Sequence, residues 1–337
     1  MRVRPVRAAL AAAVLFLPAP AAWLTRELNR PFPGPGGSVL FEVEKGRSAR
    51  SVAASLADDG IIRSALPLRA AFRLYGTTDK IKAGEYEFSF PLNAKQALFK
   101  LCEGRTYLHP VTVPEGLTGM EIEEALKDQL PGGSGAFREA FLRTGLISDW
   151  DPEARDLEGY LFPDTYRVPR SATAADLVEA MVGRFREIFD GGRRAKAEEL
   201  GLSVRDVVTL ASLIEEETSL DGERALVSAV FHNRMKIGMK LDCDPTVIYA
   251  LKLEGRYTGR LLLRDLKLPS PYNTYLRAGL PPGPISNPGE PSLHAALHPA
   301  PEKFLYFVSR NDGSHRFSRT FAEHLEAVRE YRELKKK

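Results

Sequence analysis

The sequence has few cysteines and no strong excess of charge of either sign. Its two cysteines, Cys102 and Cys243, lie far apart in 337 residues and form no CxxC pair. A zinc cage or a redox motif is therefore not expected, and we expect two free buried thiols, with one disulfide as the alternative. Lys and Arg number 47 against 44 Asp and Glu, and no basic run is interleaved with aromatics. We therefore expect no nucleic-acid partner.

Long apolar runs are also scarce, with one exception at the amino terminus. Residues 8–24 carry no charge and follow Arg2, Arg4 and Arg7. A basic flank before an apolar run is typical of a segment that the export machinery recognises. The pattern predicts a cytoplasmic tail and membrane anchor within residues 1–30, or a signal peptide there, with a buried cytosolic helix as the alternative. The expected localisation is the inner membrane, single-pass, with the remaining chain in the periplasm.

The length exceeds that of one ordinary domain, so we expect at least two. Residues 31–38 are rich in Pro and Gly and predict a linker. Residues 39–105 read as strand, two helices, strand and a further helix, which resembles a LysM-type glycan-binding module with one added helix. Residues 106–335 form the second predicted domain. The expected fold class is α+β, with an N-terminal membrane helix, a LysM-like α/β subdomain, and a mixed α/β domain that carries a glutamate on a helix.

Three adjacent glutamates end the predicted helix at residues 203–218. Glu215, Glu216 and Glu217 follow an apolar run directly. A turn of 100° per residue places Glu215 and Glu217 at the margins of the apolar face and Glu216 toward solvent. An apolar neighbourhood raises the pKa of a carboxyl, and such a group can act as a general acid near neutral pH. A solvated helix end is the alternative, and position alone does not separate Glu215 from Glu217.

Five stretches together resemble one known family. They are LEGYLFPDTY, LASLIEEET, VFHNRMKIGMKLDCDPTVIYAL, SPYNTYLRAGLPPGPISNPG and LYFVSRNDGSHRFSRTFAEH. In this order, within residues 108–332, they are similar to the YceG-like endolytic murein transglycosylases. The resemblance implies cleavage of the β-1,4 bond between N-acetylmuramic acid and N-acetylglucosamine inside peptidoglycan strands, leaving 1,6-anhydro ends. It further implies termination of nascent strands, peptidoglycan synthases as partners, and no cofactor or metal.

The resemblance also assigns residue roles. The family's catalytic acid/base corresponds to Glu215, and Glu217 corresponds to a supporting carboxyl. Glu216 departs from the family pattern, where a lysine is common. One carboxyl is chemically sufficient if the sugar's own C6 hydroxyl attacks, because the ring holds that hydroxyl at high effective concentration. Glu215 is then expected to donate a proton first and to remove one from the hydroxyl afterwards.

Polar and aromatic residues near these motifs are predicted to bind the substrate. The predicted substrate-binding set is Tyr272, Asn273, Tyr275, Asp244, Thr246, Tyr160 and Tyr166. Each has a structural alternative: Asp244 caps a helix, Asn273 bonds its own loop, and the tyrosines at 160 and 166 belong to the core. His315 is placed on a hairpin surface, with contact to a cleft as the alternative.

Two further functions compete with the transglycosylase. One is a non-catalytic peptidoglycan-binding scaffold, which the retained Glu215 disfavours. The other is a hydrolytic muramidase, for which Asp244 and Glu217 are the candidates for the second carboxylate that such enzymes need.

Overall fold

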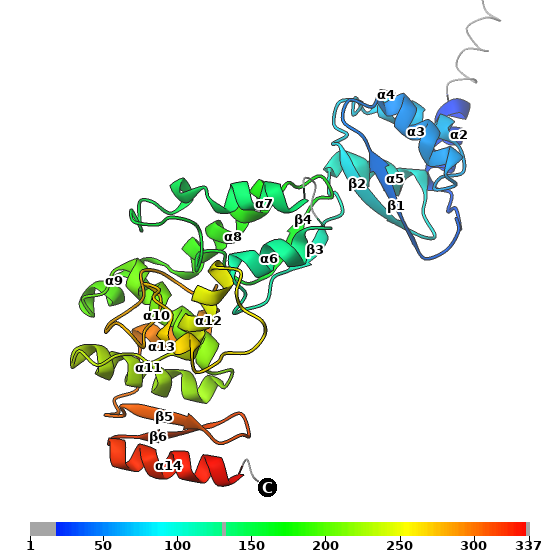
Figure 1. Cartoon of the computed structure of the whole chain (residues 1–337). Coiled ribbons are helices and arrows are strands. Elements are labelled where there is room, and N and C mark those ends of the chain that lie inside the picture. The colour runs from blue at the N-terminus through cyan, green and yellow to red at the C-terminus, as the bar shows by residue number, and fades with distance from the viewer. Residues whose placement is uncertain (1–17, 130–132, 335–337) are drawn as a thin grey trace, which may run out of the picture. The chain divides into compact units, whose positions relative to one another are not determined.

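The computed structural model describes residues 18–129 and 133–334, and the chain divides into two compact units (Figure 1). The first unit comprises residues up to Pro110 together with Arg167–Ser171, and the second comprises the rest. The chain passes between the units within two short paired strands, β3 (His109–Thr112) and β4 (Thr165–Val168). The predicted domain boundaries at residues 30, 38 and 105 remain predictions.

The first unit follows the predicted order of strand, two helices, strand and helix. Its elements are α2 (Pro18–Asn29), β1 (Ser38–Val43), α3 (Ala49–Asp58), α4 (Ala65–Leu74), β2 (Gly84–Ser89) and α5 (Ala94–Glu103). Strands β1 and β2 are antiparallel, with Phe41 opposite Tyr86 and Val39 opposite Phe88. The LysM-like character of this unit remains a prediction, because the element order alone does not establish it.

Alternation along β1 and β2 builds the core of the first unit. Phe41 and Val43 are buried while their neighbours Leu40 and Glu42 are exposed, as expected for a strand with one solvated face. Tyr86 and Phe88 of β2 are fully buried on the same side. Leu56, Leu68 and Leu101, one from each of α3, α4 and α5, complete this core. Each buried side chain of this size contributes about 1.5–3 kcal/mol.

The predicted inner-membrane, single-pass localisation is corrected by the structure. Within residues 18–129 and 133–334, no helix combines the length and the apolarity needed to cross a membrane. Helix α2 has 12 residues, which at about 1.5 Å each is well short of a hydrocarbon layer of about 30 Å. Its Leu28 is buried in the core of the first unit, and Leu24 packs against that core. Residues 8–17 of the apolar run lie outside the described residues.

The second unit is mostly helical. Its helices are α6 (Gly119–Leu126), α7 (Gly133–Phe141), η1 (Thr144–Leu146), α8 (Ala174–Ile188), α9 (Gly191–Glu199), α10 (Val204–Glu217), α11 (Asp221–Lys236), α12 (Asp244–Leu253), η2 (Asp265–Lys267), α13 (Glu290–Leu297) and α14 (Phe321–Leu334). Strands β5 (Tyr306–Ser309) and β6 (His315–Ser318) form the predicted hairpin, which packs with α14 (Figure 1). Helices α7 and α9 were not predicted from the sequence.

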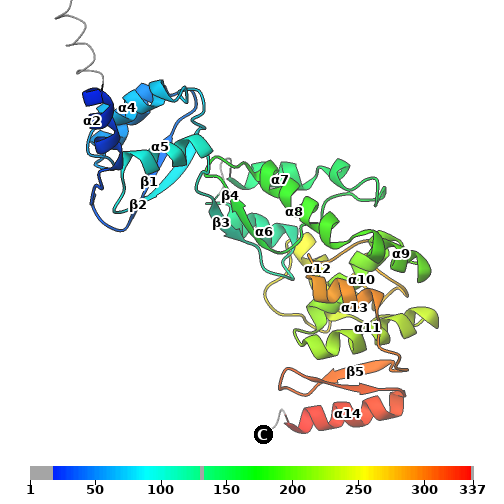
Figure 2. The ribbon, with the colours of Figure 1, turned by 180° about the vertical axis from the view of Figure 1, so that it is seen from behind.

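Helix α10 is the centre of the second unit. Its residues from Val207 to Ile214 are all buried, so it is enclosed on every side rather than on one face. It packs against α9, α11, α12 and α13, and Figure 2 shows α13 beside α10 and α11. The helix begins at a capping box in which Ser203 and Asp206 bond each other's backbone N–H. The three glutamates occupy its C-terminal turn, where the residues are no longer fully buried.

A proline- and glycine-rich loop packs into the same core. Residues 283–289 are all buried, which is unusual because loops run mainly over the surface. The Ser212 hydroxyl of α10 accepts a hydrogen bond from Ile285 N at 3.1 Å and donates to Thr209 O at 2.7 Å. These bonds fix the loop, and therefore the start of α13, against the end of α10.

The buried carboxyl of Glu158 joins three segments of the second unit. Glu158 is 4% exposed and accepts hydrogen bonds from Gly119 N at 2.9 Å, Asn287 Nδ2 at 2.9 Å and Tyr249 OH at 3.2 Å. These donors belong to α6, the buried loop and α12. Desolvation raises the pKa of Glu158 to about 8, against the opposing effect of the Gly119 hydrogen bond.

We expect Glu158→Ala to lower the free energy of unfolding of the second unit by about 2–4 kcal/mol, because each buried donor left without an acceptor costs about 1–3 kcal/mol. The measurement is urea unfolding followed by Trp150 fluorescence in a Trp23→Phe background, since the chain has two tryptophans. Glu153→Ala, at an exposed carboxyl nearby, is the control and should change stability by no more than about 0.5 kcal/mol. If Glu158→Ala and Glu153→Ala lowered the free energy of unfolding equally, the structural role assigned to the buried Glu158 carboxyl would be contradicted.

The Glu158 carboxyl also predicts how the stability of the second unit depends on pH. Its folded pKa lies above the unfolded value of 4.5, so the stability it contributes is complete below about pH 4.5 and is lost as the pH rises to about 8. Glu158→Gln should remove that part of the pH dependence.

Candidate active site

Glu215 lies in the last turn of α10, and each of its carboxyl oxygens has its own donor. Its side chain is 7% exposed. Oε1 accepts from Arg224 Nη2 at 3.3 Å, and Oε2 accepts from Gly289 N at 3.0 Å. Gly289 is the N-cap residue of α13, where the helix dipole also favours negative charge. The site therefore stabilises Glu215 as a carboxylate.

The surroundings of Glu215 differ from the apolar wall that the helical wheel predicted. The apolar neighbours on α10 are present, but α11 supplies a guanidinium and α13 supplies a backbone N–H. Arg224 is itself 7% exposed and is fixed by Ser292 Oγ at 3.0 Å and by Asp221. No pattern within α10 could reveal these partners, because they come from segments up to 74 residues away in sequence.

A second carboxyl, Glu115, lies beside Glu215 and was missed in the sequence. It precedes Gly116, whose φ of +79° allows a tight turn between β3 and α6. Backbone bonds from Gly116 N to Asn287 O (2.9 Å) and from Asn287 N to Leu117 O (3.0 Å) tie this turn to the buried loop. The only sequence signal was a glutamate before a turn glycine in VPEG, a position with no evident chemistry.

The middle glutamate differs from its neighbours. Glu216 is exposed, as the helical wheel predicted, whereas Glu215 and Glu217 are half-buried as whole residues. Its carboxyl still loses part of its hydration, and this desolvation raises the pKa of Glu216 to about 7, while a hydrogen bond with Ser286 opposes the shift.

Glu217 lines a cavity of about 420 Å³ at the opposite side of the α10 terminus. The other lining residues include Arg234, Asp242, Asp244, Tyr275, Tyr306, Phe307, His315 and Phe321. Desolvation raises the pKa of Glu217, the nearby charge of Asp244 adds to this rise, and a hydrogen bond with the Cys243 thiol opposes it. Aromatic faces and carboxyls in one cavity are suited to binding a sugar.

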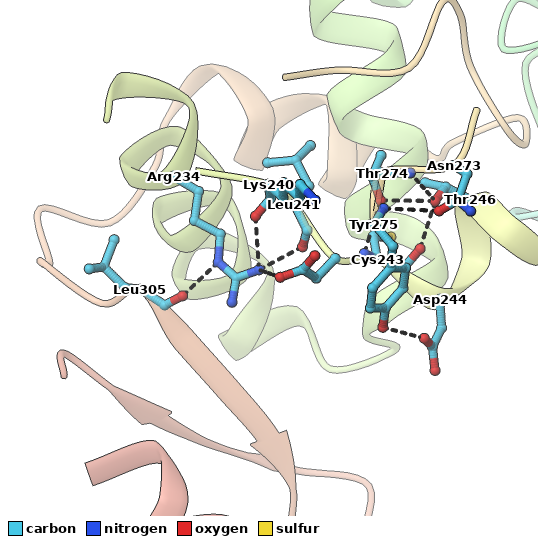
Figure 3. Close-up of polar contacts among 11 residues, drawn as sticks. Arg234, Lys240, Leu241, Cys243, Asp244, Thr246, Asn273, Thr274, Tyr275 and Leu305 are labelled. Carbon is cyan, nitrogen blue, oxygen red and sulfur yellow. Dashed lines mark hydrogen bonds and ion pairs between the residues drawn. The ribbon is translucent and has the colours of Figure 1, made fainter. Parts of the chain in front are cut away.

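The predicted pair of Asp244 and Tyr275 meets at this cavity. The Tyr275 hydroxyl donates to Asp244 Oδ1 at 2.6 Å, and Figure 3 shows the two side chains facing each other. Asp244 is exposed in the first turn of α12, whose N-cap residue is Cys243, so Asp244 is not the cap. Both side chains are available to a ligand from this side.

Arg234 fixes the wall of the cavity. Its guanidinium donates to Leu305 O at 2.7 Å and to Leu241 O at 2.7 Å, which links α11 to the segment before β5 and to the loop before α12 (Figure 3). His315 of β6 lines the same cavity, and its Nδ1 lies 2.7 Å from Glu223 Oε2. His315 therefore reaches a cleft, which was the alternative to a plain hairpin surface.

Four of the predicted substrate-binding residues are buried by other contacts. Asn273 is 0% exposed and donates to Leu266 O and Leu268 O within its own loop. Thr246 is also 0% exposed and bonds Cys243 O at 2.7 Å (Figure 3). The Tyr160 hydroxyl donates to Asp151 at 2.6 Å and the Tyr166 hydroxyl to Phe162 O at 2.5 Å. In this structure these side chains support the architecture rather than present a surface to substrate.

Tyr272 lies apart from Tyr275 although they are three residues apart in sequence. It lines a second cavity, of about 630 Å³, together with Asp151, Glu158 and Arg205. Desolvation raises the pKa of Tyr272 to about 12. The predicted site residues therefore separate into Glu215 with its ion pair, the cavity of Glu217, and the cavity of Tyr272. Both cysteines are free, with Cys243 buried and Cys102 half-buried.

Comparisons with known proteins agree with this architecture. The model of the YceG-like family matches residues 41–330. A Bacillus subtilis protein named endolytic murein transglycosylase is 32% identical over 310 residues, covering 87% of this chain and 85% of that protein. A Streptococcus pneumoniae protein of the same name is 25% identical, and this chain spans only 54% of its length.

A solved structure is similar as well. The crystal structure of a YceG-like protein from Listeria monocytogenes has a TM-score of 0.59 and 30% identity, covering 86% of this chain and 98% of that one. The family match and the coverage of the Bacillus protein confirm the resemblance found in the sequence. The chain belongs to the YceG-like family.

Proposed function

We propose that this protein is an endolytic murein transglycosylase, a lyase that cleaves the β-1,4 bond between N-acetylmuramic acid and N-acetylglucosamine inside peptidoglycan strands. The family match over residues 41–330 and the named Bacillus relative support this activity. The observation that carries the proposal is the carboxyl of Glu215. It is retained at the position that the resemblance assigns to the acid/base, and it lies in the last turn of α10 with its side chain 7% exposed.

The reaction needs two proton movements and no external nucleophile. The leaving glycosidic oxygen must gain a proton, and the C6 hydroxyl of the muramic acid must lose one as its oxygen bonds to C1 of the same sugar. The product is a 1,6-anhydro end. Because the attacking hydroxyl is intramolecular, the site needs carboxyls for proton transfer and groups that stabilise positive charge at C1. Glu215, as a carboxylate, suits both the base and the stabilising role.

The cavity of Glu217, two residues further along the chain than Glu215, is the proposed sugar-binding groove. Tyr275 and Asp244 offer a ring and a carboxylate on one wall, and the hairpin offers further aromatic faces. The activity is further proposed to terminate nascent strands next to peptidoglycan synthases, with the LysM-like unit holding the glycan.

A hydrolytic muramidase is the second candidate, because Glu217 and Asp244 line the same cavity and either could activate water. Product analysis separates the two. Purified murein digested with the full chain should give fragments with 1,6-anhydro ends by mass spectrometry, since no water enters the reaction. Heat-inactivated protein is the control. Fragments with reducing ends would instead establish the muramidase.

A further inference from the structure

The carboxyls of Glu215 and Glu115 both lie against the backbone of Gly289. Glu215 Oε2 accepts the Gly289 N–H, and a Cβ placed on Gly289 would lie 2.0 Å from Glu115 Oε1 and 2.7 Å from Glu115 Oε2. The carboxyl of Glu115 therefore lies directly against the Gly289 backbone and occupies the space that any side chain there would need. Gly289 has φ −77° and ψ 171°, an ordinary extended conformation, so backbone strain does not require glycine here.

The two carboxyls differ in access. Glu215 has both oxygens engaged and only 7% of its side chain exposed, so a polymer reaches it with difficulty. Glu115 is exposed and forms no hydrogen bond or ion pair with another described residue. A general acid must contact the leaving oxygen directly or through one water. Of the two, Glu115 is the carboxyl that a glycan strand can reach.

They also differ in their electrostatic surroundings. The charged groups that face Glu115 are Glu215 of α10 and Asp221 and Arg224 of α11, while α13 contributes the Gly289 backbone. Partial desolvation, followed by the negative charge of Glu215, raises the pKa of Glu115, and only Arg224 opposes this. Glu215, in contrast, receives the guanidinium and the N–H directly. Glu115 has neither of these donors.

We propose that Glu115 is a second catalytic carboxyl, which donates the proton to the leaving glycosidic oxygen while Glu215 acts as the base for the C6 hydroxyl. This inference rests on the proposed transglycosylase function. The C1–O bond breaks with its electron pair on the leaving oxygen, which takes the proton of Glu115. The C6 oxygen bonds to C1 as its proton passes through one water to Glu215, which the strand does not contact directly. Transfer of that proton from Glu215 to Glu115 restores the starting state, and no other reactant is needed.

Glu115→Gln tests the proposal. It should lower kcat/KM on purified glycan strands by about 10²–10³-fold, because general acid catalysis typically contributes 10²–10⁴. Wild-type activity should fall as the pH rises through the pKa of Glu115, and the variant should lack this alkaline limb. Glu290→Gln removes a neighbouring exposed carboxyl at the start of α13 and is the matched control, expected to keep its activity.

Gly289→Ala gives an independent test that leaves the chemistry of Glu115 intact. The new methyl must displace the Glu115 carboxyl, the end of a flexible side chain, while the residue keeps its N–H for Glu215. We expect a loss of activity of about tenfold or more and an unchanged thermal unfolding temperature. In a Glu115→Ala background the same substitution should cause no further loss, because coupled sites are not additive.

Two results would overturn the proposal. One is a Glu115→Gln variant that keeps wild-type turnover and the fall in activity at alkaline pH. The other is a Gly289→Ala/Glu115→Ala double variant whose loss of activity equals the sum of the two single losses. These results are distinct from a failure of the proposed function. If no anhydro ends form, or if Glu215→Gln remains active, the function or its assignment to Glu215 fails whatever Glu115 does.

Discussion

Glu215→Gln is expected to slow cleavage of glycan strands by about 10²–10⁴-fold while the protein stays folded. Glutamine keeps the size of the side chain, and its amide oxygen can still accept the Gly289 N–H. It cannot take a proton from the C6 hydroxyl, and it carries no charge to stabilise the cationic transition state. The measurement is the initial rate of release of soluble fragments from purified murein, with circular dichroism to check the fold.

The matched control is Glu216→Gln on the same turn. Glu216 is exposed, and the donors Arg224 and Gly289 bond Glu215 rather than Glu216, so this variant should cleave within about threefold of the wild type. Binding of the Glu215→Gln protein to insoluble murein should persist, since the cavity of Glu217 is untouched. Normal cleavage by Glu215→Gln would remove Glu215 from the mechanism.

Arg224→Met is expected to give the largest loss of stability, about 3–5 kcal/mol in the free energy of unfolding of the second unit. Methionine fills part of the volume but leaves the carboxylate of Glu215, 7% exposed, without its counter-ion. Removing one partner of a buried pair costs more than the pair contributes, because the remaining charge is desolvated and unpaired. Urea unfolding followed by Trp150 fluorescence in the Trp23→Phe background reports on this unit.

The double variant Arg224→Met/Glu215→Gln distinguishes this cause from simple loss of packing. With no buried charge left, a substantial part of the lost stability should return, and the two changes should be strongly non-additive. The opposite outcome is additivity, in which Glu215→Gln lowers the free energy of unfolding as much in the Arg224→Met background as in the wild type. In that case the ion pair with Glu215 is not the source of the stability that Arg224 provides. Its bonds to Ser292 and Asp221 would then carry the effect.

Local signals predicted most of the elements, because they depend on neighbours within one or two turns. Ser48, Thr118 and Ser203 cap α3, α6 and α10, and Thr118 forms a capping box with Glu121, a pattern that is readable within four residues of sequence. The hairpin of β5 and β6 closes through the turn Asn311-Asp312-Gly313-Ser314, a local signal, and Asn311 there has φ 64°. Helices α7 and α9 were missed. Helix α9 is nearly all polar or small, and its only buried residue is Ala197, so it has almost no apolar stripe.

Burial was predicted less well than helicity. The loop at residues 283–289 has the composition of a surface loop but is buried, because partners inside the core satisfy its backbone. Ile285 N donates to the Ser212 hydroxyl, and the Asn287 backbone bonds Gly116 N and Leu117 O. Asn273 looked like a ligand-binding side chain and is instead used by the backbone of its own loop. Whether a polar side chain serves substrate or structure depends on partners that lie far away in sequence.

The sequence by itself determined the helix that carries the glutamates, the exposure of Glu216 relative to its two neighbours, and the family. These follow from periodicity, from capping, and from ordered motifs within single segments. Only the tertiary structure decided which charges surround Glu215, because Arg224, Gly289 and Glu115 come from three separate segments that converge at the end of α10. The electrostatics of a carboxyl are set by groups within a few ångströms in space, and spacing along one helix does not encode them.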